Sequence, residues 1–385
     1  MTDNAICISN KDQETSINEK EEQGKSLLPE SGTQVEPTIK SIKLNNLMGI
    51  KEIGVTLSEG ITVIHGENST GKTAMLKALY CSTKPFNTIA SGRISTKAKK
   101  ENEVVNKIKN VFRPDNGAIG KIVNNKSEEK LRISVQYLDA NKMELAWGKQ
   151  ASEHIEMLDS TKNYSREVVY IPPKEIISAS ENFMALYKKF EMAFEETYYD
   201  LLELLNTPEL KNENNNTAEE IRIILEGIIG GRITKKDSKY FIINKNGEEN
   251  EMGLLSEGYR KIAILLRLIN NGSLRKGSLL LWDEPEANMN PKMIKPLVDV
   301  MVLLVKMGVQ IVIASHDYFI QQEIQLRAEY PDNKGYLLPV CFVSLYHNGD
   351  EVLAEQQERA YNLKNNAIMD EFDNIYDREQ ELIRQ

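Results

Sequence analysis

Apolar and polar residues alternate along the chain from about residue 39, and a period of two predicts β-strands. Three short strands are expected at residues 39–47, 50–57 and 60–66, with turn residues between them. The third runs directly into a glycine-rich turn and a helix that begins near Lys72. Residues 1–36 are rich in Asn, Ser, Glu, Lys and Gln and poor in aromatic residues, which predicts a disordered tail outside the fold.

The middle of the chain predicts more strands and then a helical insertion. A polar, lysine-rich stretch at about residues 83–130 precedes three strand-like segments, LRISVQYL, KMELAWG and REVVYIPPKE. After Pro172 and Pro173, apolar residues recur at near-helical spacing over about residues 176–205, which predicts a helix. A loop at residues 212–217, a second short helix and a hairpin around KNGEE complete this region.

The last third alternates strand and helix, a rhythm that is typical of a parallel α/β sheet. Strands are expected in SLLLWDEP and VQIVIASH. Each is followed by a helix, the first after Pro291 and the second after Asp317, and a further strand is expected at residues 341–346. The expected fold class is therefore α/β.

Composition and charge limit the classes of protein that fit. The chain has 385 residues, of which 41% are hydrophobic, enough for one large domain with an insertion. A formal net charge of −9 argues against a surface that is basic throughout. Cys7, Cys81 and Cys341 lack metal-ligand or redox spacing, which indicates reduced thiols. Without a secretory signal or an uncharged run of about eighteen apolar residues, we expect a soluble, cytoplasmic protein.

A phosphate-binding loop pattern lies between the third expected strand and the helix after it. Residues 66–73, GENSTGKT, contain two glycines followed by Lys and Thr. The glycines let backbone amides turn towards phosphates, Lys72 reaches the β and γ phosphates, and Thr73 ligates Mg²⁺. The expected nucleotide contacts in this loop are Gly66, Asn68, Ser69, Thr70, Gly71, Lys72 and Thr73.

An apolar run that ends in two acids marks a second part of the site. Residues 279–284, LLLWDE, have the pattern of a buried strand that delivers carboxylates to the C-terminal edge of a sheet. Asp283 would hold Mg²⁺, and Glu284 would polarise the attacking water. His316 ends the next expected strand, where an imidazole could donate to the γ-phosphate, although a lone histidine there is more often structural.

The segment LSEGYR, residues 255–260, opens a helix upstream of those acids. Ser256 is a good N-cap, and apolar residues follow it at helical spacing. An amide-rich helix start with a hydroxyl side chain and Gly258 suits an anion, but the same residues also fit a capped structural helix. Taken alone, the segment leaves both interpretations open.

Together these motifs occur in the order that defines the ABC ATPases: the glycine-rich loop, LSEGYR, WDEPEANMNP and SHD. The match spans about residues 39–318, and its opening closely resembles the heads of structural-maintenance-of-chromosomes proteins, RecF and the overcoming-lysogenisation-defect family. Similar stand-alone chains are often identified as AAA family ATPases, and several act in phage-defence modules beside a separate effector. The resemblance implies a P-loop NTPase fold, an ABC-ATPase head with N-terminal strands and a parallel core sheet flanked by helices. The implied parts are core at 37–174, an inserted helical lobe at 175–230, core at 231–347, and a hairpin end and helix at 348–385.

The resemblance also implies a dimer. Two copies would sandwich two ATP molecules, each bound by the Gly66 loop of one copy and by Ser256 and Gly258 of the other, so an isolated copy should hydrolyse ATP poorly. The implied roles are Walker A for Lys72 and Thr73, metal binding for Asp283, catalytic base for Glu284, switch for His316, and a D-loop position for Asn288.

Two departures from the transporter pattern stand out. LSEGYR is not the LSGGQ of most transporter subunits, and no glutamine begins a Q-loop, because the strand VVYIP ends in PPKE instead. Lys174 or Glu175 could substitute near the metal and γ-phosphate, or a rigid Pro-Pro bend could serve only to start the inserted helices. These two residues stay outside the expected catalytic set.

The leading functional hypothesis is a nucleotide-gated dimerisation switch, the sensor or regulator ATPase of a bacterial anti-phage module with a separate effector protein. The alternative is a DNA-repair or chromosome-associated ATPase of the RecF and SMC kind. The signature sequence, the missing glutamine and the long insertion disfavour a transporter subunit. A self-contained nuclease is disfavoured because the short segment after His316 lacks a closely spaced pair of acids of the Asp-x-Asp kind.

A local run of basic residues keeps nucleic acid open as a partner. It contains Arg93, Lys97, Lys99, Lys100, Lys107, Lys109 and Arg113. A phosphate groove there would bind in a salt-dependent way, whereas such a run is more often a solvated, partly flexible face. Aromatic residues for base stacking are sparse, with Phe112 as the main candidate.

Overall fold

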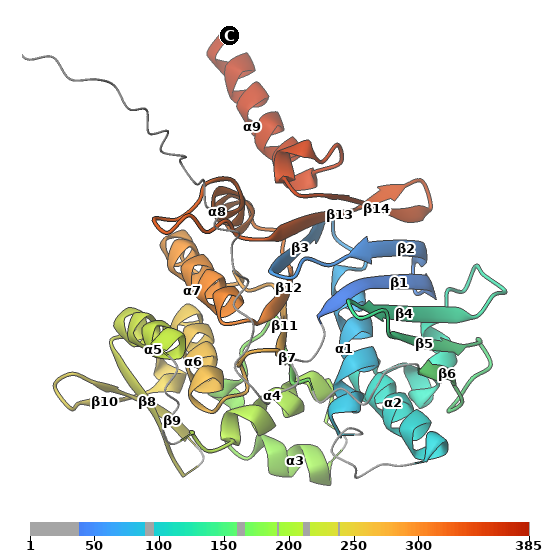
Figure 1. Ribbon diagram of the computed structural model, residues 1–385, viewed down its shortest axis with the longest axis horizontal. Coiled ribbons are helices and arrows are strands. Elements are labelled where there is room, and N and C mark those ends of the chain that lie inside the picture. Colours follow the sequence, from blue (N-terminus) through green and yellow to red (C-terminus); the bar gives the residue numbers. More distant parts are fainter. Residues whose placement is uncertain are drawn as a thin grey trace, which may run out of the picture. The chain divides into compact units, whose positions relative to one another are not determined.

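Two large β-sheets and a small one organise the chain (Figure 1). The computed structural model describes residues 38–88, 96–159, 166–190, 192–210, 216–237 and 239–384. The expected tail at residues 1–36, together with Cys7 and Arg93, lies outside the described residues.

The first large sheet carries the site. It has six strands in the order β14-β13-β3-β12-β11-β7, all parallel except β14 at one edge. Every residue of β3, β7, β11 and β12 is buried, because helices cover both faces of a parallel sheet. The bounds are β3 Ile61–Gly66, β7 Val168–Ile171, β11 Leu279–Asp283, β12 Gln310–Ala314, β13 Val340–Asn348 and β14 Glu351–Gln357.

The second sheet is antiparallel and has the order β2-β1-β4-β5-β6. The three expected N-terminal strands are confirmed, but the first two belong to this sheet and the third belongs to the parallel one. Helix α1, Lys72–Thr88, packs in the hydrophobic core between the two sheets through Met75, Leu76 and Leu79. The bounds are β1 Ile39–Leu47, β2 Ile50–Thr56, β4 Leu131–Tyr137, β5 Lys142–Trp147 and β6 Glu156–Asp159.

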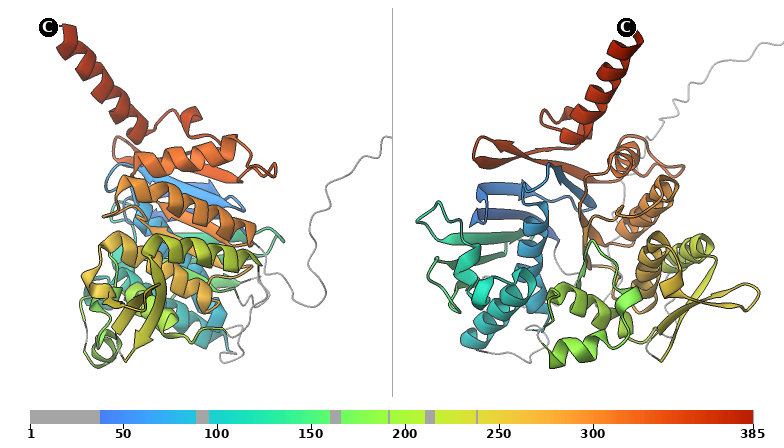
Figure 2. Two further views of the ribbon diagram at one scale, coloured as in Figure 1. Left: turned by 90° about the vertical axis from the view of Figure 1, so that its left-hand side faces the viewer. Right: turned by 180° about the vertical axis from the view of Figure 1, so that it is seen from behind.

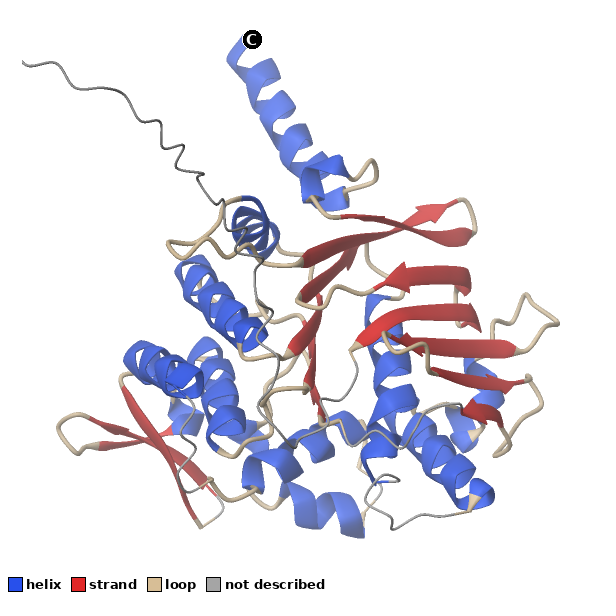
Figure 3. Cartoon of the chain, in the orientation of Figure 1, coloured by secondary structure: helices blue, strands red, loops and turns tan. Residues whose placement is uncertain are grey.

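Helices cover the other face of the parallel sheet and form a second core with it (Figure 3). They include α4 Glu196–Asn206, α5 Asn216–Ile229, α6 Glu257–Asn270, α7 Ile294–Lys306 and α8 Tyr318–Glu329. Beside α5 and α6 lies the small antiparallel sheet, formed by β8 Gly231–Lys236, β9 Lys239–Asn244 and β10 Glu249–Glu251. Among the described residues, the helices are all too short or too polar to span a membrane.

The expected helix over residues 176–205 is wrong as a single element. It divides into a 3₁₀ turn at Ile177–Ala179, α3 at Phe183–Lys189 and α4. Phe190 ends α3 in an extended conformation, and the Arg113 side chain donates to the carbonyls of Met192 and Phe194 in the break. Arg113 therefore supplies hydrogen bonds to carbonyls that would accept from backbone amides if the helix were continuous. The expected loop at 212–217 is also shorter, since α5 begins at Asn216.

The lysine-rich stretch contains a helix that the sequence analysis missed. Helix α2, Lys97–Phe112, begins at Thr96, whose hydroxyl accepts from the Lys99 amide. Its buried face is formed by Val104, Val105, Lys107, Ile108 and Val111. The apolar residues have helical spacing, but the lysines between them give the segment the composition of a loop.

Candidate functional site

Two glycines shape the loop between β3 and α1. Gly66 has a φ of +146°, and a Cβ there would lie 2.0 Å from the Leu345 carbonyl oxygen of β13. Gly71 has a φ of +92°, and its Cβ would meet the Ile50 side chain. Residues with a Cβ fit neither position, so the glycines fix the loop as it turns from the sheet edge into α1.

Lys72 lies inside this loop. Its Nζ donates to the carbonyls of Gly66, at 2.7 Å, and Glu67, at 2.8 Å. Burial lowers the pKa of Lys72, and the carboxylates of Glu284 and Asp283 oppose that shift. The cation is thus held on backbone oxygens at the place where phosphate oxygens would compete for it.

Thr73 and Asp283 meet at the end of β11. Asp283 is buried and accepts hydrogen bonds from the Thr73 hydroxyl and, at 3.2 Å, from the Tyr170 hydroxyl of β7. Burial raises the pKa of Asp283 to about 6. A hydroxyl and a carboxylate side by side are oxygen ligands of the kind that Mg²⁺ prefers, so these residues fit that ion.

Glu284, His316 and Glu286 form an acid–imidazole group beside them. Glu284 has a φ of +49°, and its amide donates to the Ala314 carbonyl of β12. His316 Nδ1 lies 3.7 Å from Glu284 Oε1 and 3.8 Å from Glu286 Oε1. Buried Glu286 accepts from the Ser315 hydroxyl and the His316 amide, and burial raises its pKa. Glu286 thereby fixes the backbone that carries His316.

A cavity of about 380 Å³ brings the loop and Glu284 together. Residues 68–74 form one side of it, including the expected Asn68, Ser69 and Thr70. Apart from Glu284, the remaining lining residues form a largely apolar wall: Leu47, Met48, Gly49, Ile50 and Val352. The sequence analysis missed this apolar wall, because it comes from the β1–β2 turn and from β14, far apart in sequence.

The signature residues lie elsewhere on the same chain. Ser256 occupies the N-cap position of α6, but its exposed hydroxyl makes no capping hydrogen bond, contrary to expectation. Gly258 is buried, and a Cβ there would lie 3.4 Å from Met289 Cγ. Neither residue lines the cavity at the phosphate loop. One chain alone therefore does not assemble the two halves of the expected site.

Side chains missed in the sequence analysis connect α6 to the acids. Lys261, which is fully buried, donates to the carbonyls of Glu284, at 3.0 Å, and Ala287, at 2.9 Å. Asn288 has a φ of +59°, and its side-chain amide donates to the Glu257 carboxylate at 2.8 Å. The signature helix thus holds the turn that follows β11. The sequence did contain one sign of these contacts, because Lys261 lies in the middle of the apolar face of α6 and a buried lysine needs polar partners.

Glu175, one of the two residues considered in place of the Q-loop glutamine, pairs with the signature helix. Its side chain is 4% exposed, and Oε1 lies 2.7 Å from Arg260 Nε on α6. The Lys174 backbone amide donates to the Tyr198 hydroxyl of α4. Glu175 is therefore engaged with the signature helix and not with Asp283.

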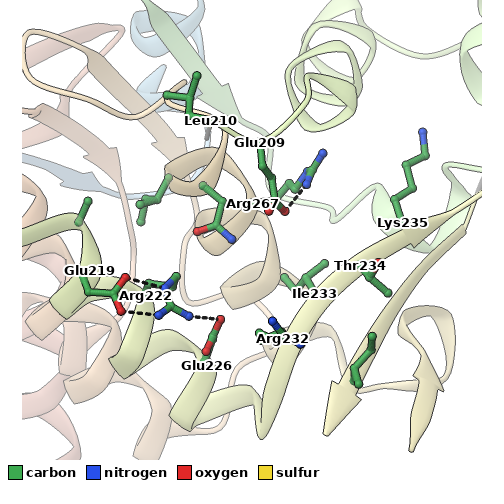
Figure 4. Close-up of a pocket in the computed structure, with 14 residues that line it drawn as sticks. Glu209, Leu210, Glu219, Arg222, Glu226, Arg232, Ile233, Thr234, Lys235 and Arg267 are labelled. Atoms are coloured by element: carbon green, nitrogen blue, oxygen red, sulfur yellow. Dashed lines mark hydrogen bonds and ion pairs between the residues drawn. The ribbon is translucent and has the colours of Figure 1, made fainter. Parts of the chain in front are cut away.

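Another cavity, of about 790 Å³, lies beside α5, α6 and β8 (Figure 4). Several of its charged residues form ion pairs, Arg222 with Glu219 and Glu226, and Arg267 with Glu209, and the cations Arg232 and Lys235 also line it. The phosphate loop and Glu284 do not line it. We interpret it as a structural network.

Part of the basic stretch serves the fold. Lys107 is buried and pairs with Asp200 at 2.9 Å and Glu196 at 3.0 Å. Lys109 pairs with Glu153 at 2.6 Å. Phe112 packs against the core. The expectation of a solvated face fits Lys97 and Lys99, which are exposed, but is wrong for Lys107, whose charge is buried and neutralised.

Comparison with known proteins identifies the family. Residues 61–320 match the family AAA_21, described as "AAA domain, putative AbiEii toxin, Type IV TA system". A search of curated proteins found no match. Among solved structures, an Smc head bound to the C-winged helix domain of ScpA has 12% identity, a TM-score of 0.49, and coverage of 83% of this chain and 98% of its own.

Two further solved structures are similar. The SMC head domain from Thermotoga maritima has 11% identity and a TM-score of 0.46, over 83% of this chain and 98% of its own. The recombination mediator protein RecF-ATPrS of the RecFOR pathway has 13% identity and a TM-score of 0.45, over 84% of this chain and 99% of its own. The family match alone covers 260 of the 385 residues, and the chain accordingly belongs to this AAA-domain family of P-loop ATPases.

Proposed function

We propose that the chain binds ATP with Mg²⁺ in the cavity at the phosphate loop and hydrolyses it between two head-to-tail copies. The observation that carries this proposal is the meeting of Lys72, Thr73, Asp283 and Glu284 around one site. A cation, a hydroxyl–carboxylate pair and a second carboxylate are the groups that phosphoryl transfer to water needs.

Each group has a distinct part in the reaction. Lys72 exchanges its contacts with the Gly66 and Glu67 carbonyls for phosphate oxygens. Thr73 and Asp283 would hold Mg²⁺, which neutralises charge on the β and γ phosphates. Glu284 accepts a hydrogen bond from the attacking water, and His316, 3.7 Å from Glu284, donates towards the γ-phosphate.

The apolar wall accounts for the rest of the nucleotide. Met48, Ile50 and Val352 face the same cavity as the phosphate loop. A purine base is flat and largely apolar, so it fits against such a wall while its triphosphate reaches the backbone amides of the loop.

A second copy would complete the site. Ser256 and Gly258 lie outside the cavity of their own chain, and the Ser256 hydroxyl is exposed and makes no cap. In a head-to-tail dimer these groups would contact the γ-phosphate bound by the other copy. Nucleotide would then act as the link that holds two copies together, and hydrolysis would release them.

This cycle suits a switch whose state a separate protein reads. The family description names a type IV toxin–antitoxin system, and we extend that context to this chain as the regulator of a separate effector in a bacterial defence module. The inserted helices α3 to α5 are short, so they suit docking a protein better than extending a coiled-coil arm.

The test is the solution mass of the Glu284→Gln variant with and without ATP and Mg²⁺. This variant should bind nucleotide, turn over slowly and gain mass through dimerisation when both are present. A matched Glu284→Gln, Ser256→Arg variant should bind ATP without that nucleotide-dependent gain in mass. A mass unchanged by nucleotide would exclude the composite site.

A further inference from the structure

The C-terminal helix α9, Ala367–Arg384, has no buried residue, although one of its faces is apolar. At about 100° per residue, Phe372, Ile375, Tyr376, Leu382 and Ile383 fall within an arc of about 120°. Leu382 and Ile383 are each 71% exposed. A helix of this length is only marginally stable alone in water, so packing of its apolar face against another surface would stabilise it.

Among the described residues, contacts with the rest of the chain are confined to the start of α9. Phe372 stacks on Tyr318 of α8 with ring centroids 4.6 Å apart, and Gln322 lies within hydrogen-bond distance of Met369. Beyond that turn the helix extends away from the sheets (Figures 1 and 2). Its last three turns therefore carry an apolar face without a partner among the described residues.

The charge of α9 indicates the chemistry of its partner. The helix has six acidic and two basic residues, a net charge of −4. Glu379 projects from the centre of the apolar arc, one turn from Tyr376 and Ile383. Pairing two such helices would bring acidic residues together, whereas a basic, aromatic groove would pair Glu379 and cover the apolar side chains.

This chain carries such a groove at its opposite end, between α2 and α3. The groove has a volume of about 660 Å³, and none of the described residues that line it is acidic. Its cations are Lys109, Arg113, Lys188 and Lys189, and its apolar residues include Tyr187, Phe190 and Met192. Phe190 is 55% exposed with Lys189 over its ring.

We propose that α9 of one copy docks in the α2–α3 groove of a second copy. The two surfaces are opposite in charge, both carry apolar side chains, and both are uncovered in the described structure. Because α9 and the groove lie at opposite ends of the described structure, α9 cannot reach the groove of its own chain (Figure 1). The contact is therefore heterologous, and it links copies in series independently of the ATP-bridged dimer.

A mixing experiment tests this contact in the full chain without nucleotide, by analytical ultracentrifugation. One variant, Glu379→Lys with Leu382→Asp, disables α9, and the other, Lys188→Glu with Lys189→Glu, disables the groove. All four residues are exposed, and unchanged thermal unfolding would show that both variants fold. The wild type should associate with increasing concentration, and each variant alone should be monomeric.

The mixture gives the decisive result. One intact α9 and one intact groove remain between the two variants, so an equimolar mixture should form a heterodimer and nothing larger. A monomeric wild type, or a groove variant that self-associates like the wild type, would overturn the proposal. So would groove substitutions that leave association unchanged but abolish binding of a fluorescent single-stranded oligonucleotide, since the groove would then serve nucleic acid.

Discussion

Glu175 and Arg260 form an ion pair of 2.7 Å that joins the segment after β7 to the signature helix α6. The β7 segment lies beside the strand that carries Asp283, and α6 begins with the residues proposed to contact nucleotide on another copy. A nearly buried ion pair between these segments gives a direct physical link between the two half-sites of one chain.

A double-mutant cycle measures this link. The effects of Glu175→Gln and Arg260→Gln on the free energy of unfolding should be coupled by about 1–3 kcal/mol. Either change leaves the remaining charged side chain nearly buried and without its counter-charge. The matched control is Glu371 with Arg378, an exposed pair at 2.9 Å, whose coupling should stay below about 0.5 kcal/mol. Equal couplings for the two pairs would contradict the link.

Replacing Glu284 by Gln should slow ATP hydrolysis by roughly a hundredfold and leave nucleotide affinity nearly unchanged, because the amide keeps the shape but cannot accept the proton of water. Phosphate release and binding of a fluorescent ATP analogue measure the two quantities. Lys72→Ala is the comparison, and it should lose binding itself. Wild-type turnover in the Gln variant would remove Glu284 from the catalytic role.

A composite site makes a prediction about mixed variants. Lys72→Ala and Ser256→Arg should each be inactive alone, since each lacks one half of both sites. Random pairing in an equimolar mixture leaves half of the dimers mixed with one intact site each, so about a quarter of wild-type activity should return. Activity that stays at the level of the separate variants would show that Lys72 and Ser256 do not act across an interface.

The elements that the sequence predicted correctly are those set by local pattern. The strands β1 to β3, the loop before α1 and the acid-ended strand β11 follow from alternation, glycine placement and short apolar runs. Helix α2 was missed because lysines stand between its apolar residues, and the 176–205 helix was overextended because the contacts of Arg113 with the carbonyls of the break are not visible in the local pattern.

In the candidate site, too, the sequence predicted the residues of local motifs but not the contacts between distant segments. Lys72, Thr73, Asp283 and Glu284 belong to contiguous motifs, and the structure brings them to one place. The carbonyl contacts of Lys261 and the Glu175–Arg260 pair depend on tertiary packing between distant segments. No residue spacing encodes such contacts.

Lys107 should be a stabilising charge in spite of its place in a basic stretch. Replacing it by Met leaves the carboxylates of Asp200 and Glu196 buried without a cation, which should cost about 3–5 kcal/mol of unfolding free energy. Lys109→Met on the same helix, whose partner Glu153 is largely exposed, should cost less than about 1 kcal/mol. Similar losses for both variants would refute the buried network.

His65 should make the fold sensitive to acid. It lies in β3 immediately before Gly66, fully buried, with neither ring nitrogen hydrogen-bonded, and burial lowers its pKa to about 4. The unfolded chain, with a histidine pKa near 6.5, binds the proton more readily than the folded one. Stability is therefore complete above that value and falls as the pH drops towards 4, by about 2–3 kcal/mol from this group.

The difference between two variants isolates this effect from the many carboxylates that also titrate. His65→Leu should flatten the dependence of unfolding free energy on pH between about 6.5 and 4, whereas His347→Leu, at an exposed position of β13, should leave the wild-type slope. Denaturant unfolding at several pH values gives both slopes. Parallel curves of unfolding free energy against pH for His65→Leu and the wild type would contradict this prediction. They would mean that protonated His65 is accommodated in the folded state, so that its burial does not control acid stability.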